Sequence, residues 1–168
     1  KKILGFGVAP ESIGFGSTFS YKDFSASILV EGKMGGSFYS GTNNWYKVYG
    51  LHKDTVPAGG REAGFTPDGV MEDGTVITTS IPMSKQEDYW SQTLNIGEEN
   101  VGSADYMRLR QLSIGYNVPS SMLEGSFISN ATVSLIGRNL LLLSNSSDNV
   151  DPESSYAAGN AVGLERAG

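Results

Sequence analysis

The residue types best suited to contacting a ligand in this sequence are four aromatic side chains in one long stretch. Trp45, Tyr46, Tyr49 and Trp90 all fall between residues 33 and 104. Aromatic faces stack on sugar rings and pack against peptide side chains, so these four residues are candidate substrate contacts. The alternative is that they pack the interior of their own segment, since a long connection needs internal packing to stay compact.

A second group of chemically capable residues is acidic. Asp148, Asp151 and Glu153 carry the oxygen ligands that Ca²⁺ prefers. Their spacing does not fit an EF-hand loop, which needs acidic groups at alternating positions and glycine at the sixth. Turn chemistry at Asp151-Pro152 explains the same residues. The sequence therefore predicts no metal site.

Three arginines belong to strand-like segments. Arg108, Arg110 and Arg138 could hold an anionic substrate or pair with carboxylates on neighbouring strands. Arg108 and Arg110 share the parity of Leu112 and Ile114, so alternation alone places them on the apolar face, further along the strand. Both roles stay open at this stage.

Composition removes several function classes. The chain has no cysteine and one histidine, His52, which excludes disulfides, cysteine nucleophiles and multi-histidine metal sites. No serine lies in a Gly-x-Ser-x-Gly elbow, and Gly14-Phe15-Gly16 lacks the Lys-Ser/Thr of a phosphate loop. A net charge of −6 argues against nucleic acid. We expect no enzyme activity and no cofactor.

The elements that must position these residues are predicted to be strands. The 168 residues are enough for about one domain, and period-2 alternation with Ser, Thr, Gly, Tyr and Phe dominates. We predict strands at 13–21, 24–32, 106–118 and 131–142, with a hairpin turn at Lys22-Asp23. Pro119 ends the third strand, and 119–123 suit one helical turn.

One parity of these strands is apolar and the other is small and uncharged. That pattern suits a soluble sandwich, or a membrane barrel with lipid on one face and a wet lumen on the other. Connections that alternate short, very long and short favour the barrel, as does an aromatic group near the short-turn end formed by Tyr21, Phe24 and Tyr116. The position of five apolar residues distinguishes the sandwich from the barrel. In a sandwich they converge on one closed core, and in a barrel fragment they form a continuous open face. The five residues are Phe15, Phe19, Ile28, Leu112 and Ile114.

Several segments, in order along nearly the whole chain, resemble the C-terminal part of SusC/RagA-type TonB-dependent outer-membrane transporters. They are Phe19-Ser-Tyr-Lys-Asp-Phe24, Gly35-Gly-Ser-Phe-Tyr-Ser-Gly-Thr-Asn43, Tyr49-Gly-Leu-His-Lys-Asp-Thr55, Gly60-Arg-Glu62, Tyr89-Trp90, Tyr106-Met-Arg-Leu-Arg-Gln-Leu-Ser-Ile-Gly-Tyr116, Gly137-Arg-Asn-Leu140 and Asp148-Asn-Val-Asp-Pro-Glu-Ser154.

The resemblance implies an all-β fold in which residues 1–168 are a C-terminal barrel fragment in the Gram-negative outer membrane, crossing it several times. It implies a long extracellular loop at 33–104 that helps close over substrate, with no plug domain and with the family's final strand missing. Implied partners are the rest of the barrel and the plug, membrane lipid, a SusD-like lipoprotein, and TonB through the missing N-terminal part. The implied substrate is an oligosaccharide or a peptide. The alternative function is a soluble β-sandwich that binds carbohydrate or acts as an adhesin-like module.

Overall fold

The computed structural model describes residues 2–155 and 162–165 of the chain. These residues divide into two compact units. One contains the described residues of Lys1–Gly5, Phe38–Gly102 and Asp148–Gly168, and the other contains Phe6–Ser37 and Ser103–Ser147. Each unit is described by itself.

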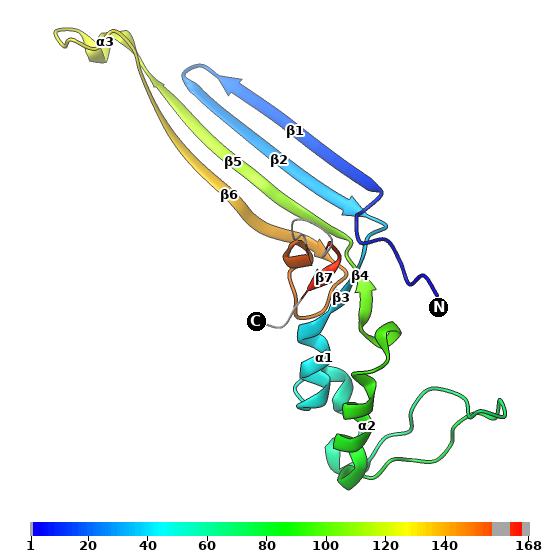
Figure 1. Cartoon of the computed structure of the whole chain (residues 1–168). Coiled ribbons are helices and arrows are strands. Elements are labelled where there is room, and N and C mark those ends of the chain that lie inside the picture. The colour runs from blue at the N-terminus through cyan, green and yellow to red at the C-terminus, as the bar shows by residue number, and fades with distance from the viewer. Residues whose placement is uncertain (1, 156–161, 166–168) are drawn as a thin grey trace. The chain divides into compact units, whose positions relative to one another are not determined.

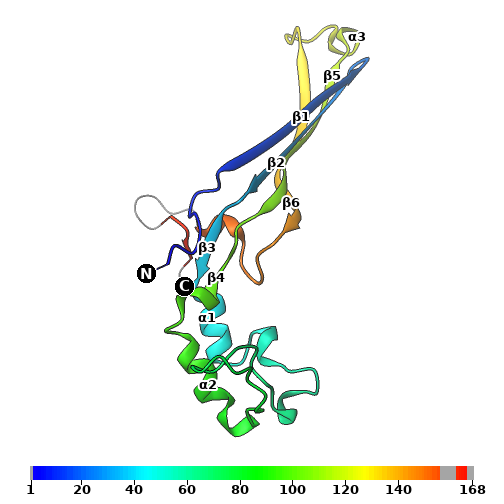
Figure 2. The same cartoon turned by 90° about the vertical axis from the view of Figure 1, so that its right-hand side faces the viewer.

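The second unit is built on a four-stranded antiparallel sheet. Its strands are β1 (Glu11–Tyr21), β2 (Phe24–Met34), β5 (Tyr106–Val118) and β6 (Ala131–Asn145), in the order β1-β2-β5-β6. Figures 1 and 2 show them as a single twisted layer of long strands. They overlap the four ranges predicted from alternation, and the predicted antiparallel β class is confirmed.

Both short connections lie at the same end of this sheet (Figure 1). The β1–β2 turn joins Tyr21 to its partner Phe24, and Lys22 in the turn has a left-handed φ of 53°. The β5–β6 connection begins at Pro119 and contains the single helical turn α3 (Ser120–Leu123), where a helical turn was expected. The row of paired residues at this end extends across the sheet, because Phe24 pairs with Tyr116 and Tyr116 pairs with Val133.

One face of the sheet is apolar. Cα partners in an antiparallel sheet share a face, so the register gathers Phe19 with Ala26, Ala26 with Ile114, and Ile114 with Leu135. The other members of this apolar face include Ile13, Phe15, Tyr21, Phe24, Ile28, Val30, Leu112, Tyr116 and Val133. Phe19 and Leu135 are each 76% exposed. The five residues chosen to discriminate barrel from sandwich therefore share one open face, as the barrel alternative requires.

The opposite face is small and polar near the short-turn end. Thr18, Ser27 and Ser113 form one row across it, which ends at the apolar Ile136 on β6, and Ser20, Ser25, Gly115 and Ser134 form the next. The hydroxyls of Ser27 and Ser113 are 2.6 Å apart. This face is suited to water or to a closely packed polar partner.

The alternation prediction is wrong for Arg108 and Arg110. The pairing of β5 shifts register on both sides, between Leu29 and Val30 on β2 and between Leu109 and Gln111 along β5 itself. The extra residue of such a bulge breaks the strict alternation of faces. Arg108 is therefore the partner of Glu31, on the polar face.

The segment between β2 and β5 is folded rather than extended. It contains β3 (Ser37–Ser40), α1 (Gly41–Val48), α2 (Gln86–Thr93) and β4 (Val101–Ser103), with 3₁₀ turns at Lys53–Thr55, Arg61–Ala63, Met83–Lys85 and Gly97–Asn100. β3 also pairs in parallel with β7 (Leu164–Glu165), which gives a small sheet of order β4-β3-β7. The two short helices were not predicted from periodicity.

Few apolar residues of the described chain are fully enclosed. Phe38, Ala104 and Tyr106 are the buried hydrophobic residues among those described. The four-stranded sheet has no second layer of its own within the described residues, so its apolar face needs an outside partner. No described helix has the length and apolar character that a membrane crossing requires.

Candidate functional site

A pocket of about 430 Å³ lies in the unit formed largely by residues 38–102. Its lining includes two of the four predicted aromatic residues, Tyr49 and Trp90, and three polar residues that sequence reasoning missed, Arg61, Gln86 and Glu87. These residues come from the end of α1, the turn Arg61–Ala63 and helix α2. Because the segments are separated in sequence, no local motif could have indicated the set.

Helix α1 is fixed at its N-terminus by side chains. The hydroxyl of Ser40 accepts a hydrogen bond from the Asn43 amide at 3.1 Å, the usual N-cap contact. The buried Glu165 carboxylate accepts from the Ser40 hydroxyl at 3.0 Å, the Thr42 amide at 3.0 Å and the Thr42 hydroxyl at 2.6 Å. A negative charge at this position stabilises the helix dipole. These contacts hold the helix that carries Tyr49 at its C-terminal end.

The structure places the four predicted aromatic residues in different surroundings, and their contact with a substrate stays a prediction. Tyr49 lines the pocket, is 68% exposed and stacks on Trp45, with ring centroids 5.6 Å apart. Trp90 also lines the pocket, but its ring stacks on Phe65 at 5.4 Å. Tyr46 is not among the lining residues, and its carbonyl accepts from the amides of residues 51 and 52. The structure therefore brings Tyr49 and Trp90 to one pocket, with Trp45 behind Tyr49.

Trp90 belongs mainly to the packing of its own segment. Its ring makes an edge contact with Tyr89 at 5.1 Å in addition to the stack on Phe65. Its indole N–H is buried and has no acceptor among the described residues. Such an unmade hydrogen bond costs free energy, which the packing of the ring against Phe65 and Tyr89 has to offset.

Arg61 is held in place from two sides. The Gln86 side-chain amide donates to the Arg61 carbonyl at 3.1 Å, and the Arg61 guanidinium donates to the Gly50 carbonyl. Gly50 has a left-handed φ of 67°, and a Cβ there would lie 3.1 Å from the Arg61 Nη1. The left-handed φ and this close approach both favour glycine at position 50.

The two charged lining residues are not paired with each other. Among the described residues, neither Arg61 nor Glu87 forms an ion pair. Both residues are exposed to solvent.

A polar cluster lies beside α1 in the same unit. His52 is buried, and its Nδ1 accepts a hydrogen bond from the Asp54 amide at 3.2 Å. Burial is the main effect that lowers the pKa of His52; nearby Asp54 opposes this shift and Lys47 adds to it. Lys47 is itself buried and donates to the Glu99 carbonyl at 3.2 Å. His52 is therefore neutral here, because a protonated imidazole could not accept a hydrogen bond at Nδ1.

The acidic residues considered for calcium have other contacts. Asp148 pairs with Lys53 at 2.6 Å, and the hydrogen bond from Lys53 is the main cause of a lowered Asp148 pKa. Asp151 Oδ1 accepts from the Glu153 amide at 2.9 Å, which is the turn geometry weighed against calcium. No cluster of three metal-ligating side chains occurs in residues 2–155 and 162–165.

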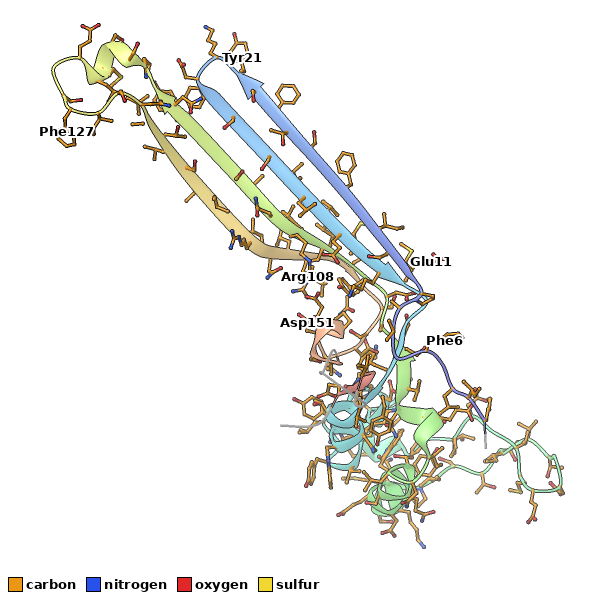
Figure 3. All side chains as sticks on the ribbon, turned by 45° about the horizontal axis from the view of Figure 1, so that its top comes forward. Phe6, Glu11, Tyr21, Arg108, Phe127 and Asp151 are labelled. Carbon is orange, nitrogen blue, oxygen red and sulfur yellow. The ribbon has the colours of Figure 1, made fainter. Side chains whose placement is uncertain are left out.

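The sheet carries a separate charged cluster. Arg110 Nε donates to Glu31 Oε2 at 2.6 Å, and its Nη1 and Nη2 donate to Asn139 and to the Tyr106 hydroxyl at 3.0 and 3.2 Å. Arg108, labelled in Figure 3, lies with its guanidinium 5.8 Å from the Tyr106 ring. For Arg110 the pairing with a neighbouring strand's carboxylate is therefore the observed role.

Comparison with known proteins finds relatives along nearly the whole chain. "TonB-dependent receptor P3" of Formosa agariphila is 26% identical over 161 residues, 95% of this chain and 14% of the relative. "TonB-dependent receptor P26" of the same organism is 28% identical over 162 residues, 96% of this chain and 15% of the relative. No protein-family model matches the chain. The chain spans about one seventh of the length of these curated relatives.

Solved structures share the fold. A chain of the RagAB peptide importer in its closed-closed state matches 98% of this chain and 16% of its own length, with a TM-score of 0.62 and 21% identity. The open-open state of the same importer matches 94% of this chain and 15% of its own length, with a TM-score of 0.58 and 20% identity. Together with the receptor relatives, these matches confirm the resemblance to SusC/RagA-type TonB-dependent receptors.

Proposed function

We propose that this chain, a segment of SusC/RagA type, forms part of the barrel wall and the outer mouth of a nutrient importer in the outer membrane. The observation that carries the proposal is the open apolar face of the four-stranded sheet, opposite a face of small polar residues. A barrel wall needs this division, because one face meets lipid and the other meets a wet interior.

Strand length supports the membrane assignment. β1 and β2 each contain 11 residues, and the apolar parity of β1 runs from Ile13 to Tyr21. A tilted membrane strand needs about 9–11 residues. A soluble sandwich would bury this face under a second sheet, whereas Phe19 and Leu135 are largely exposed.

Sheet topology supports an orientation. The two short connections share one end of the sheet, and the long segment between β2 and β5 leaves from the other. Outer-membrane barrels have short periplasmic turns and long outer loops. In the proposed orientation the β1–β2 turn and α3 face the periplasm, and residues 33–104 lie outside the cell.

The proposed role places the pocket on the substrate side. An outer segment with exposed aromatic residues suits capture of a nutrient before its import. The proposed partners are the plug and the remaining barrel strands of the parent protein, a SusD-like lipoprotein and TonB. The RagAB structures, which come from a peptide importer, and the receptor names of the relatives support an importer. The chain needs no catalytic residues for this role.

Site-specific labelling of the full-length parent receptor tests the membrane assignment. Single cysteines at positions 15, 19 and 135, and at 18, 20 and 134, carry spin labels in reconstituted bilayers. We expect the first set to be relaxed by oxygen and the second by a water-soluble nickel chelate, because oxygen concentrates in lipid. Equal access of both sets to the chelate would show that the apolar face does not contact lipid.

A second labelling experiment tests the orientation. On intact cells, a membrane-impermeant maleimide should label a cysteine at Asp68 and should leave one at Ser121 unlabelled. Labelling of Ser121 alone would reverse the proposed orientation. Labelling of both positions only after cells are broken would place neither segment outside.

A further inference from the structure

We propose that a groove on the apolar face of the four-stranded sheet holds one acyl chain of a bilayer phospholipid in a fixed position. This inference rests on the proposed function, which turns that face toward lipid. It adds a defined binding site to a surface that otherwise needs only fluid lipid around it.

The groove lies between β5 and β6 and has a volume of about 230 Å³. Ile114 on β5 pairs with Leu135 on β6. In the next row of the same face, Leu112 pairs with Gly137. The lining residues are Leu112, Ile114, Leu135, Ile136, Gly137 and Leu140. None of them has a polar side chain, so a ligand is held there by hydrophobic and dispersion contacts.

The hollow exists because Gly137 has no side chain. A Cβ at this position would lie 2.7 Å from Cδ2 of Leu140, so the Leu140 side chain leans over the glycine. Any other residue at position 137 would have to displace Leu140 and would fill part of the groove.

A β-bulge brings Leu140 to this position. The pairing of β5 with β6 leaves Asn139 and Leu140 together opposite Arg110. Asn139 has a left-handed φ of 50°, and its side-chain oxygen accepts a hydrogen bond from Arg110 Nη1 at 3.0 Å. The ion pair with Glu31 holds the same guanidinium. Polar contacts thus fix the bulge that forms one wall of the groove.

The position and the lining of the groove favour an acyl chain as its occupant. Leu112 is the middle residue of the 13-residue strand β5, and the middle of a membrane-spanning strand lies in the hydrocarbon core. All the lining residues belong to two paired strands, so the groove is complete without a third strand. The rival occupant is a side chain of the parent receptor that enters from the free edge of β6.

Photo-crosslinking of the full-length parent receptor in reconstituted bilayers tests the proposal. The probe is phosphatidylethanolamine with an alkyl diazirine in the middle of one acyl chain, and mass spectrometry maps the labelled residues. Phe19 lies in the same row as Leu135, and each is 76% exposed. In a Phe19→Leu background, we expect positions 135 and 140 to be labelled about fivefold or more above position 19, because a held chain keeps its contacts with the groove.

Variants that fill the groove provide the second test. Leu112→Phe and Gly137→Ala should each lower the labelling of positions 135 and 140 to the level of position 19. Val133→Phe, on the same face but outside the lining, is the matched control and should keep the excess. Heat-modifiable gel migration checks that each barrel is folded. An unchanged excess in both folded groove variants would overturn the site.

The outcomes separate this proposal from the proposed function. Equal labelling of positions 19, 135 and 140 would overturn the acyl-chain site and would keep the lipid-facing surface. Labelling of position 19 without positions 135 and 140 would show that a side chain of the receptor fills the groove, and would also overturn the site. Labelling of none of the three positions would contradict the membrane role and the site together.

Discussion

Arg110 on β5 and Glu31 on β2 form an ion pair across the sheet, with Arg110 Nε 2.6 Å from Glu31 Oε2. The pair lies where the β5 register shifts, and the same guanidinium reaches Asn139, a residue with a left-handed φ of 50°. The side chains are 18% and 32% exposed, so the pair is more shielded than a surface salt bridge. The ion pair stabilises the β-bulge at this position, where the strict alternation of side chains between the two faces is interrupted.

Breaking this pair should destabilise the sheet. Arg110→Gln removes the ion pair and two further hydrogen bonds, and we expect a loss of about 1–3 kcal/mol in unfolding free energy. Urea titration of the refolded parent receptor, followed by heat-modifiable gel migration, measures the change. Arg138→Gln, an exposed arginine on β6, is the control and should cost under about 0.5 kcal/mol. Equal losses would mean that the cluster contributes nothing specific.

The Glu165 carboxylate should stabilise α1 through its charge. Glu165→Gln keeps an acceptor for Thr42 but removes the negative charge at the helix N-terminus, an effect of about 0.3–2 kcal/mol. Hydrogen exchange of the full receptor should become faster in residues 41–48. Glu124→Gln, exposed beyond α3, should leave that exchange unchanged. Unaltered protection in the Glu165 variant would show that the negative charge does not contribute to the stability of α1.

The segment around His52 should lose stability in acid. The pKa of His52 is lowered in the folded protein, so the unfolded chain binds the proton more readily. The neutral form therefore contributes full stability above about pH 6.5, and this contribution falls as the pH drops through the lower folded pKa. The protection factors of residues 52–56 in hydrogen exchange, which compare each measured rate with the intrinsic rate at the same pH, should fall as the pH is lowered from 7 to 5. In His52→Asn, whose side chain can still accept from the Asp54 amide, this pH dependence should disappear.

Phe127 should contact the membrane interface at the short-turn end. It is 99% exposed in the β5–β6 connection, near Met122 at 70%, and Figure 3 shows it on the loop beside α3. Residues 119–130 contain a single charged side chain, Glu124, and aromatic residues concentrate at membrane interfaces. A tryptophan at position 127 in proteoliposomes should be quenched by brominated lipid, and one at Ser121 less so. Absence of quenching at 127 would place the loop in water.

The strands were predictable because their alternation is local. The range 106–118 coincides with β5, and the turn at Lys22-Asp23 was identified from the hairpin pattern. The face of Arg108 was not predictable from parity, because a bulge adds a residue without changing the residue types around it. Asn139, a residue type that tolerates left-handed φ, was the one available signal for that irregularity.

The helices and the pocket depended on contacts distant in sequence. α1 contains eight residues, too few to be stable without caps, and its cap includes Glu165, more than 120 positions away. Arg61 and Glu87 have no shared motif because a fold, not a spacing, brings them to one lining. Aromatic content alone identified Tyr49 and Trp90, and it also selected Tyr46, which does not line the pocket.

The pairing of β3 with β4 lowers the entropy cost of closing the long connection between β2 and β5. The long segment enters through β3 and leaves through β4, which are adjacent in one small sheet, and the Ala104 amide donates to the Gly36 carbonyl at 2.9 Å. An unstructured connection of some seventy residues would cost about 2–3 kcal/mol more to close than one of four, because closure entropy grows with the logarithm of length. A folded insert whose ends already meet avoids most of this difference. The pairing of β2 with β5 therefore does not depend on the length of the segment between them, and that segment can vary in size and sequence without weakening the four-stranded sheet.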